Sequence, residues 1–500
     1  MSSDENISRE RLEAAPGKVY TETIQEPTYE FKREHYFSPL IETNKAWAVM
    51  LVDTGIIDED VGAQLLDAVA DLEEAGPEEL GEYNPNLEYF YSHMEYQLNK
   101  RIGEEVAGNI NIGRTRPEPL ARIVERERLL DVLDRVVSLR ATLLDLAERE
   151  IKTVMPQWTH YQHAQVSTVA HYLLGIADSL ERDTQRLMNA YDTVNECTLG
   201  CGALAGTSYD LDRQLIADLL GFDGYKENTI DCVSGGDHHM EPASAMANMM
   251  VTLSRFCQDL YTWHTWEFDF VEISDEYSGS SSLMPQKKNP YPFEYVRGRA
   301  AYATAYMSSV HETLHNTNFQ DIKDVEENAV HPLFDAFDEV DRSLKLLDGT
   351  VGSAEFNAEQ MEELAAEGFA SCSELAAKID RQTDLTYRTA HRIVGDLVGR
   401  ALERGLDATE VDADLVNESA TEITGDMLDI DDEFVQSALD PREFVEAHDI
   451  PGGPAPREVR RMIQDRRASL DEDSVYINRR RETLIDASDK LADRVETIRS

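Results

Sequence analysis

Apolar residues recur at helical spacing along most of this chain. The clearest case runs from Ala121 to Ile151, a stretch without glycine or proline. Its apolar residues form a stripe broader than the seam of a coiled coil, made of Leu129, Leu130, Val132, Leu133, Val136, Val137, Leu143, Leu144 and Ala147. The same pattern predicts four further long helices, over residues 167–198, 242–272, 293–315 and 329–348. The pattern therefore indicates a mostly α-helical protein.

The length of these helices bears on how the chain associates. A helix of about 30 residues extends roughly 45 Å, which is hard to bury within a single chain of this kind. Apolar stripes wide enough for two neighbours predict a long helix bundle that associates with copies of itself.

Three segments of the chain differ in their pattern. Residues 1–112 contain short elements and many turn residues, residues 113–362 carry the long helices, and residues 363–500 return to shorter helices and acidic turns. We therefore expect an N-terminal domain, a central helix bundle and a C-terminal helical domain with these bounds. The basic run that ends at Arg481 is expected to be an exposed helix face.

The charge of the chain is strongly unbalanced. Its 500 residues include 97 Asp and Glu against 47 Lys and Arg, a formal net charge of −50. Such a surface repels nucleic acids and anionic membranes, so neither is an expected partner. The evenly spread apolar residues argue against disorder. The acidic excess instead favours a protein kept soluble in concentrated salt, in the cytoplasm of a halophile.

No export segment, membrane span or metal site is expected. Residues 1–15 lack the apolar centre of a signal peptide, and no apolar run reaches membrane-spanning length. The five cysteines follow no disulfide or zinc pattern, so we expect reduced thiols. His238 and His239 are adjacent, and adjacent side chains on a helix are expected to point apart rather than share an ion.

The candidate chemistry centres on residues 278–290. Gly279 and three serines precede Lys287 and Lys288, in a chain that has only 12 lysines. A Gly/Ser segment suits a mobile loop that presents a hydroxyl, and a nearby ammonium stabilises an alkoxide or a carboxylate-derived anion. A flexible surface loop with a basic end is the simpler alternative.

Two further strings carry groups suited to proton transfer or substrate binding. Residues 155–165 combine Thr159, His160 and Gln165, and the histidine titrates near neutral pH. A histidine at the end of a helix is, however, more often structural. Arg114 and Arg116 open a predicted helix, where they form either a carboxylate clamp or a solvated pair.

Together these strings resemble those of the fumarase/aspartase superfamily, and most closely its argininosuccinate lyase branch. The motif Met-Pro-Gln-Lys-Lys-Asn-Pro at residues 284–290 is the most specific part of the resemblance. The match extends from about residue 100 to 460 and is weak before that.

The resemblance implies a fold and a reaction. The implied fold is mostly α, with three domains and a homotetramer whose core bundle has about twenty helices. Active sites in this superfamily are shared between protomers, and the members eliminate fumarate from a substituted succinate. The expected activity is therefore that of a carbon–nitrogen lyase acting on an N-substituted aspartate such as argininosuccinate, in arginine biosynthesis, with no metal and no organic cofactor.

The resemblance also assigns roles to residues. Ser281 matches the catalytic base, and His160, oriented by Glu294, matches the acid that protonates the leaving nitrogen. Lys287 matches the cation that stabilises the developing anion. The substrate contacts implied are Arg114, Thr115, Arg116, Thr159, Gln165, Ser282, Asn289, Asn318 and Lys323.

Several positions depart from the family pattern. Where the family holds the non-fumarate half of its substrate, Asn318, Lys323 and Glu326 replace Tyr, Gln and Lys. The alternatives to argininosuccinate are a paralogous lyase for a different N-substituted aspartate and a catalytically silent scaffold protein, as the lens crystallins of the family illustrate. The other departures are Thr115, Pro117, Glu118, Val166 and Ser280.

Overall fold

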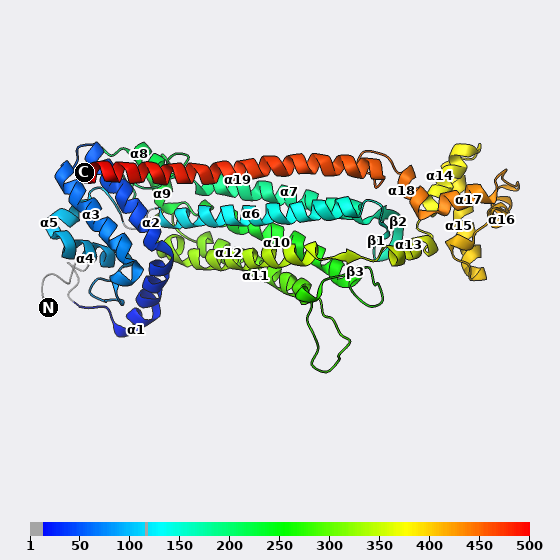
Figure 1. Cartoon of the computed structure of the whole chain (residues 1–500), viewed down its shortest axis with the longest axis horizontal. Helices are drawn as coiled ribbons and strands as arrows, with labels where there is room; N and C mark the ends of the chain where they lie inside the picture. The colour runs from blue at the N-terminus through cyan, green and yellow to red at the C-terminus, as the bar shows by residue number, and fades with distance from the viewer. Residues whose placement is uncertain (1–13, 116–118) are drawn as a thin grey trace.

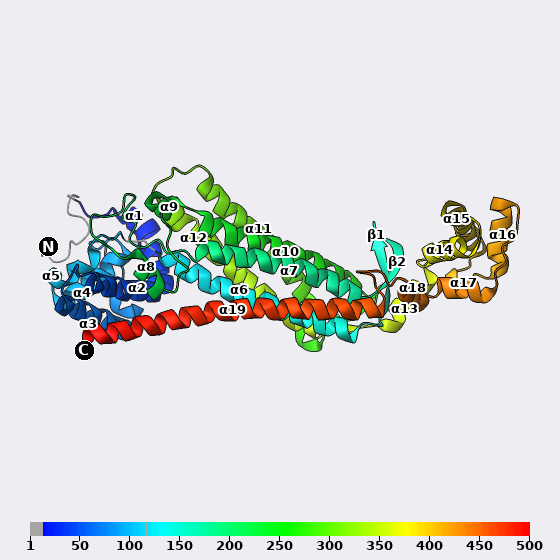
Figure 2. The ribbon, with the colours of Figure 1, turned by 90° about the horizontal axis from the view of Figure 1, so that it is seen from above.

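The computed structural model describes residues 14–115 and 119–500, which form a long helix bundle with a lobe at each end (Figures 1 and 2). The N-terminal lobe and the C-terminal lobe lie at opposite ends of the long axis. Within the described ranges, no helix combines the length and the apolar character that crossing a membrane requires.

The N-terminal lobe is helical, and its core continues into the adjoining bundle and the last helix through side chains such as Val330 and Leu491. Apolar side chains of its longest helix, α2, pack against α3 and α4, with Trp47 and Leu51 fully buried. Pro39, although proline is a turn residue, lies inside α2. The elements of the lobe are α1 (Lys18–Tyr20), the π-helix η2 (Thr21–Gln25), α2 (Glu26–Asp53), α3 (Glu59–Ala75), η3 (Pro77–Leu80), α4 (Phe90–Ile102), α5 (Glu104–Ala107) and η4 (Gly108–Asn111).

Five long helices form the central bundle. The stripe read from the sequence of α6 is buried against α7, α12 and their neighbours, because its apolar positions face one side of the helix. All five predicted long helices are present, with ends that differ by up to nine residues from those expected. They are α6 (Leu120–Arg149), α7 (Val169–Val194), α10 (Asp237–Trp263), α11 (Tyr291–His315) and α12 (Val330–Gly352); the shorter α8 (Arg213–Leu219), α9 (Thr229–Ser234), η5 (Asp275–Tyr277) and η6 (Asp324–Asn328, a π-helix) lie in the connections.

Two small antiparallel sheets interrupt the helices. β1 (Val154–Thr159) pairs with β2 (Gln162–Thr168) between α6 and α7. β3 (Val271–Glu272) pairs with β4 (Glu355–Phe356), which ties the end of α10 to the end of α12. Neither sheet was expected from the sequence.

The C-terminal lobe is a separate cluster of short helices. Leu375, Ile393, Leu397 and Val416 are among the side chains of its own core. Aspartate side chains cap α16 and α17, which accounts for the acidic turns in this region. The elements are α13 (Ala358–Glu367), α14 (Cys372–Gln382), α15 (Tyr387–Arg404), η7 (Ala408–Glu410), α16 (Ala413–Thr424), α17 (Asp432–Leu439) and α18 (Pro441–Ala447).

The last helix differs from the expectation that only short helices follow residue 360. α19 (Pro456–Arg499) has 44 residues and returns along the whole bundle to the N-terminal lobe (Figure 2). Its arginines pair with aspartates of other helices: Arg481 with Asp134 of α6, and Arg494 with Asp53 of α2. The expectation of an exposed basic face holds in part: Arg479 is exposed, whereas Arg480 and Arg481 are half-buried and fasten α19 to the bundle through aspartates. Residues 456–499 thus lie with the bundle and the N-terminal lobe, outside the C-terminal lobe.

Candidate active site

The Ser-rich segment forms a loop between β3 and α11 that projects from the flank of the bundle (Figure 1). Backbone hydrogen bonds of 2.8 Å in each direction between Gly279 and Asn289 close its base. The Asn289 side chain is buried and donates to the Gly279 carbonyl at 3.0 Å. Glycine is required at 279, because a Cβ there would lie 2.1 Å from the Tyr291 ring. A tight neck therefore carries a largely exposed loop.

Ser281 lies in a turn within this loop. Its Oγ accepts hydrogen bonds from the backbone amides of Leu283 at 3.3 Å and Met284 at 3.0 Å. Amide donors aimed at an oxygen stabilise negative charge on it. The surroundings of Ser281 therefore suit a hydroxyl that gives up its proton, whereas Ser282 beside it is simply exposed.

The two lysines of the loop have different surroundings. Lys288 pairs with Glu272 at 2.5 Å and with Asp275 at 2.9 Å, and these hydrogen bonds raise its pKa. Lys287 is exposed and forms no ion pair with any residue that the structure describes. Lys287 is thus the ammonium of this loop that is available to an anionic ligand.

His160 lies at the tip of the β1–β2 hairpin. His160 and Tyr161 form its two-residue turn, with φ of 55° and 59°. Such turns require this left-handed conformation at both positions, although residues other than glycine adopt it uncommonly. The placement of His160 at a helix end, expected from the sequence, is wrong, because the segment between α6 and α7 pairs with itself. Thr159, His160 and Gln165 are all exposed.

Glu294 lies in the first turn of α11 and is also exposed. Its carboxylate is close enough to Tyr261 of α10 to raise the pKa of that hydroxyl. No hydrogen bond joins Glu294 to His160 within the described part of one chain, so the pair implied by the resemblance is not formed inside a protomer.

A cavity of about 740 Å³ lies where the N-terminal lobe meets the bundle. It is bordered by Thr115 and Lys323 and by aromatic side chains that include Tyr29 and Tyr89. Arg114, next to Thr115, donates to the Asn44 side chain at 2.5 Å and lies over the rings of Trp47 and Tyr91. Arg116 and Pro117 are outside the described residues, and Asn318 is exposed without bordering the cavity.

Lys323 is held by carboxylates at the edge of this cavity. Its Nζ lies 2.6 Å from Glu326 and 2.9 Å from Glu327, and Lys32 also contacts Glu327, at 2.7 Å. Burial alone would lower the pKa of Lys323, but the two carboxylates outweigh burial and raise it. The ammonium that replaces a family glutamine is therefore already paired within the protein.

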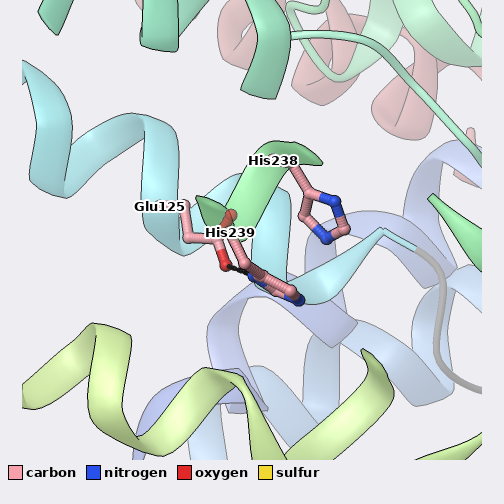
Figure 3. A group of neighbouring side chains, drawn as sticks. All are labelled: Glu125, His238 and His239. Atoms are coloured by element: carbon pink, nitrogen blue, oxygen red, sulfur yellow. Dashed lines mark hydrogen bonds and ion pairs between the residues drawn. The ribbon is translucent and has the colours of Figure 1, made fainter. Parts of the chain in front are cut away.

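Two histidines at the floor of the cavity, His238 and His239, are not oriented as expected from the sequence. The ring centroids of His238 and His239 are 3.8 Å apart, so the adjacent side chains do not point apart (Figure 3). His239 is anchored by Glu125 at 2.6 Å and by the Val325 carbonyl at 3.1 Å, which draws its ring toward that of His238. Burial, followed by Arg122 and His239, holds the pKa of His238 well below its usual value.

The candidate residues fall into separate groups. The hairpin with His160 lies at the end of the bundle near α13, and the Ser281 loop projects from the flank of the bundle (Figure 1). The cavity with Thr115 and Lys323 lies at the other end, against the N-terminal lobe. A single chain therefore presents the parts of the site without bringing them together.

Known proteins are similar in sequence to this chain over most of its length. The family described as Lyase matches residues 28–304, and the family described as Argininosuccinate lyase C-terminal matches residues 369–446. The argininosuccinate lyase of Methanothermobacter thermautotrophicus is 36% identical over 442 residues, which are 88% of this chain and 94% of that protein. That of Methanosarcina mazei is 32% identical over 499 residues, 99% of each.

This chain belongs to the argininosuccinate lyase family.

Solved structures share the fold of this chain. The crystal structure of EDDS lyase in complex with formate has a TM-score of 0.86 at 30% identity, and covers 97% of this chain and 96% of that one. The fumarate lyase of Mesorhizobium sp. BNC1, at 19% identity and a TM-score of 0.70, shares the fold. The mostly α fold of the fumarase/aspartase type, expected from the sequence, is confirmed.

Some residues of the site went unnoticed in the sequence. Lys32, Glu125 and Glu327 are ordinary charged positions on helices, and nothing in their local pattern marks them. Glu125 and His239 are 114 residues apart along the chain, so only the packing of α6 against α10 brings them together. A charged residue on the apolar stripe of α6 was the one available signal for Glu125.

Proposed function

We propose that this member of the argininosuccinate lyase family is a carbon–nitrogen lyase that eliminates fumarate from an N-substituted aspartate, with argininosuccinate as the leading substrate. The observation that carries the proposal is the position of the four reactive groups. Ser281 and Lys287 lie on a projecting loop, His160 on a hairpin tip and Glu294 on an exposed helical turn, all reachable by a substrate. Their retention argues against a silent scaffold protein.

The proposed reaction uses one base and one acid. Ser281 Oγ removes a proton from Cβ of the aspartate, and the electron pair first spreads into the neighbouring carboxylate. Lys287 and Thr159 stabilise that doubly charged form. The amide of Asn289, expected to contact substrate, is instead occupied in closing the loop that presents Lys287. The Cα–N bond then breaks as the double bond of fumarate forms, and His160, oriented by Glu294, gives the leaving nitrogen its proton.

The proposed active unit is a homotetramer whose sites are shared between protomers. The separation of hairpin, loop and cavity within one chain supports this arrangement, since activity needs all three. Tyr291, Tyr295 and Tyr302 of α11 are exposed along one helix, which supports burial of this face by another copy. Arg114, Thr115, Arg116, Gln165 and Ser282 would then contact substrate from different protomers.

The identity of the leaving amine depends on the residues that border the cavity. Two observations support a second candidate, a lyase for another N-substituted aspartate. Lys323 is already paired with Glu326 and Glu327, so it does not simply take over the carboxylate of an arginine. The structure of EDDS lyase is also similar to this chain over nearly all of its length.

Fumarate release from a panel of N-substituted aspartates tests both candidates. We expect argininosuccinate to be cleaved in about 2–4 M salt, where surface charges are screened, as followed by the ultraviolet absorbance of fumarate. Lys323→Gln with Glu326→Lys, which restores the family pattern, should change KM for argininosuccinate more than kcat, because these positions hold the leaving amine. Lys345→Gln, at an exposed ion pair of α12, is the matched control.

Two outcomes of this panel would contradict the proposal. If argininosuccinate is cleaved only by the double variant, the argininosuccinate assignment fails and the reaction class survives. If a folded protein releases fumarate from no member of the panel, the scaffold alternative replaces the lyase.

The proposed setting is the cytoplasm of an organism with concentrated internal salt. The net charge of −50 per chain would reach about −200 in a tetramer, and unscreened repulsion of that size opposes a shared core. We expect no nucleic-acid partner, because a surface of this charge repels phosphates.

A further inference from the structure

Three side chains that the proposed reaction does not use converge at the floor of the cavity. Glu125 comes from α6, and His238 and His239 come from the first turn of α10 (Figure 3). Their exposed fractions are 0%, 7% and 1%. One ligand atom from each, two imidazole nitrogens and one carboxylate oxygen, lie within 4.8 Å of one another. The two histidines also border the cavity, so the group is reachable from it.

The hydrogen bonds of His239 fix which of its nitrogens is available. Its Nε2 lies 3.1 Å from the Val325 carbonyl, which only accepts, so Nε2 carries a proton and donates. Its Nδ1 faces Glu125 Oε1 at 2.6 Å, with a single proton between the two atoms. The ring is thereby held with Nδ1 toward the carboxylate. A backbone carbonyl that accepts from the far nitrogen is the usual support of a histidine that binds a metal.

Two atoms of the same group have no hydrogen-bond partner among the described residues. They are Glu125 Oε2 and His238 Nδ1, and both are buried. Buried polar atoms are nearly always paired, and an ion is one of the recognised reasons for an exception. If Glu125 and His239 served only as a hydrogen-bonded pair, that pair would explain one contact of the cluster. Glu125 Oε2 and His238 Nδ1 would then have no function.

The charged groups around the cluster carry one more negative than positive charge before an ion is added. Arg122 Nη2 lies 3.9 Å from the Asp237 carboxylate, which is 3.8 Å from His238 Nδ1. Lys226 contacts Asp237 at 3.4 Å. Arg122 and Lys226 thus offset Asp237 and Glu125, and the neighbouring Asp231, 3.1 Å from Lys226, adds a further negative charge. The environment as a whole is therefore not cationic, despite the nearby arginine.

We propose that Glu125, His238 and His239 bind one divalent transition-metal ion at the floor of the cavity. Two histidines and one glutamate are the donor set of many open zinc sites, in which a fourth position is left for water or a ligand. That position would face the cavity and accept an anionic oxygen from whatever occupies it. Binding displaces the proton between His239 and Glu125 to solvent. It also brings the spacing of the ligand atoms to about 3.3 Å, the edge of a tetrahedron with zinc-length bonds, which lengthens the 2.6 Å contact between His239 and Glu125 and shortens the wider spacings.

Metal titration of the intact, tag-free protein tests this proposal without any substrate. We expect one Co²⁺ per chain, with the visible absorption of a low-coordinate site that Zn²⁺ abolishes by competition, in about 2 M KCl to screen surface carboxylates. Glu125→Gln and His238→Gln should each weaken Co²⁺ binding at least about a hundredfold. His391→Gln, an exposed histidine of α15, is the matched control and should bind as the natural protein does.

Two results would overturn the proposal. The first is the absence of stoichiometric Co²⁺ or Zn²⁺ binding to the natural protein. The second is unchanged binding in both cluster variants, which would place the ion on surface carboxylates. Should Glu125→Gln fail to fold, His238→Gln decides alone, since its Nδ1 makes no hydrogen bond with a described residue that the change would remove. Because binding is measured without turnover, failure here leaves the lyase proposal standing.

Discussion

Replacing Ser281 by alanine should lower kcat by at least about a thousandfold, equivalent to about 4 kcal/mol of transition-state stabilisation. The change removes the oxygen that takes the Cβ proton, and no neighbouring side chain of the turn replaces it. The backbone amides of Leu283 and Met284, which donate to Ser281 Oγ, are exposed and can turn to water, so the loop should keep its shape. Substrate binding, measured by calorimetry, should therefore change little.

The neighbouring serine gives the matched control. The Ser280 side chain is exposed, and only its backbone carbonyl contributes to the loop by accepting from Asn289. Ser280→Ala should therefore keep nearly the natural rate. A Ser281→Ala enzyme with near-normal activity, alongside an inactive Ser280→Ala, would show that the base has been assigned to the wrong serine.

His160→Asn and Glu294→Gln should each slow turnover by about a hundredfold or more, as expected for the loss of general-acid catalysis. Asparagine suits position 160, because it adopts the left-handed conformation of this turn more readily than most residues. The double variant should be scarcely slower than His160→Asn alone, since the carboxylate acts only through the imidazole. Losses in kcat that multiply in the double variant would contradict the pairing.

The long helices could be predicted because their cause is local. Apolar residues at helical spacing, without glycine or proline, are enough to specify α6, and the same holds for α7, α10, α11 and α12. The Ser281 loop was equally visible, because a run of small residues near prolines marks a loop whatever surrounds it. Short strings of the site could therefore be located before the fold was known.

The hairpin and the last helix were not predicted from the sequence, for different physical reasons. Pro156 lies within β1, and a proline inside an apolar run argues against a strand; the strand tolerates it beside an irregularity in the pairing with β2. α19 buries a narrow apolar stripe with a spacing of seven residues, which includes Ile463, Leu470 and Ile477, within a segment otherwise rich in charged residues. Arginine pairs to distant aspartates add to its attachment. Those partners lie hundreds of residues away, so no local pattern reveals them.

Which residues come together in the complete site could not be predicted from the sequence. A motif locates Ser281 or His160 on its own segment but says nothing of which segments meet in space. The cluster of Glu125, His238 and His239 shows the same limit, since α6 and α10 meet only in the folded bundle. Local strings predicted the chemistry, and packing decides where its parts come together.

Complementation between two inactive variants tests the central claim, a fumarate-releasing site assembled from several protomers. Ser281→Ala and His160→Asn chains, coexpressed with different tags and purified as mixed assemblies, should recover about a quarter of the natural rate, because about one site in four receives both intact residues from different chains. Ser281→Ala coexpressed with Lys287→Ala should recover nothing, since both residues belong to one loop. Mixed assemblies of the first pair that release fumarate no faster than either parent would show that Ser281 and His160 act within one chain, and would contradict the shared site.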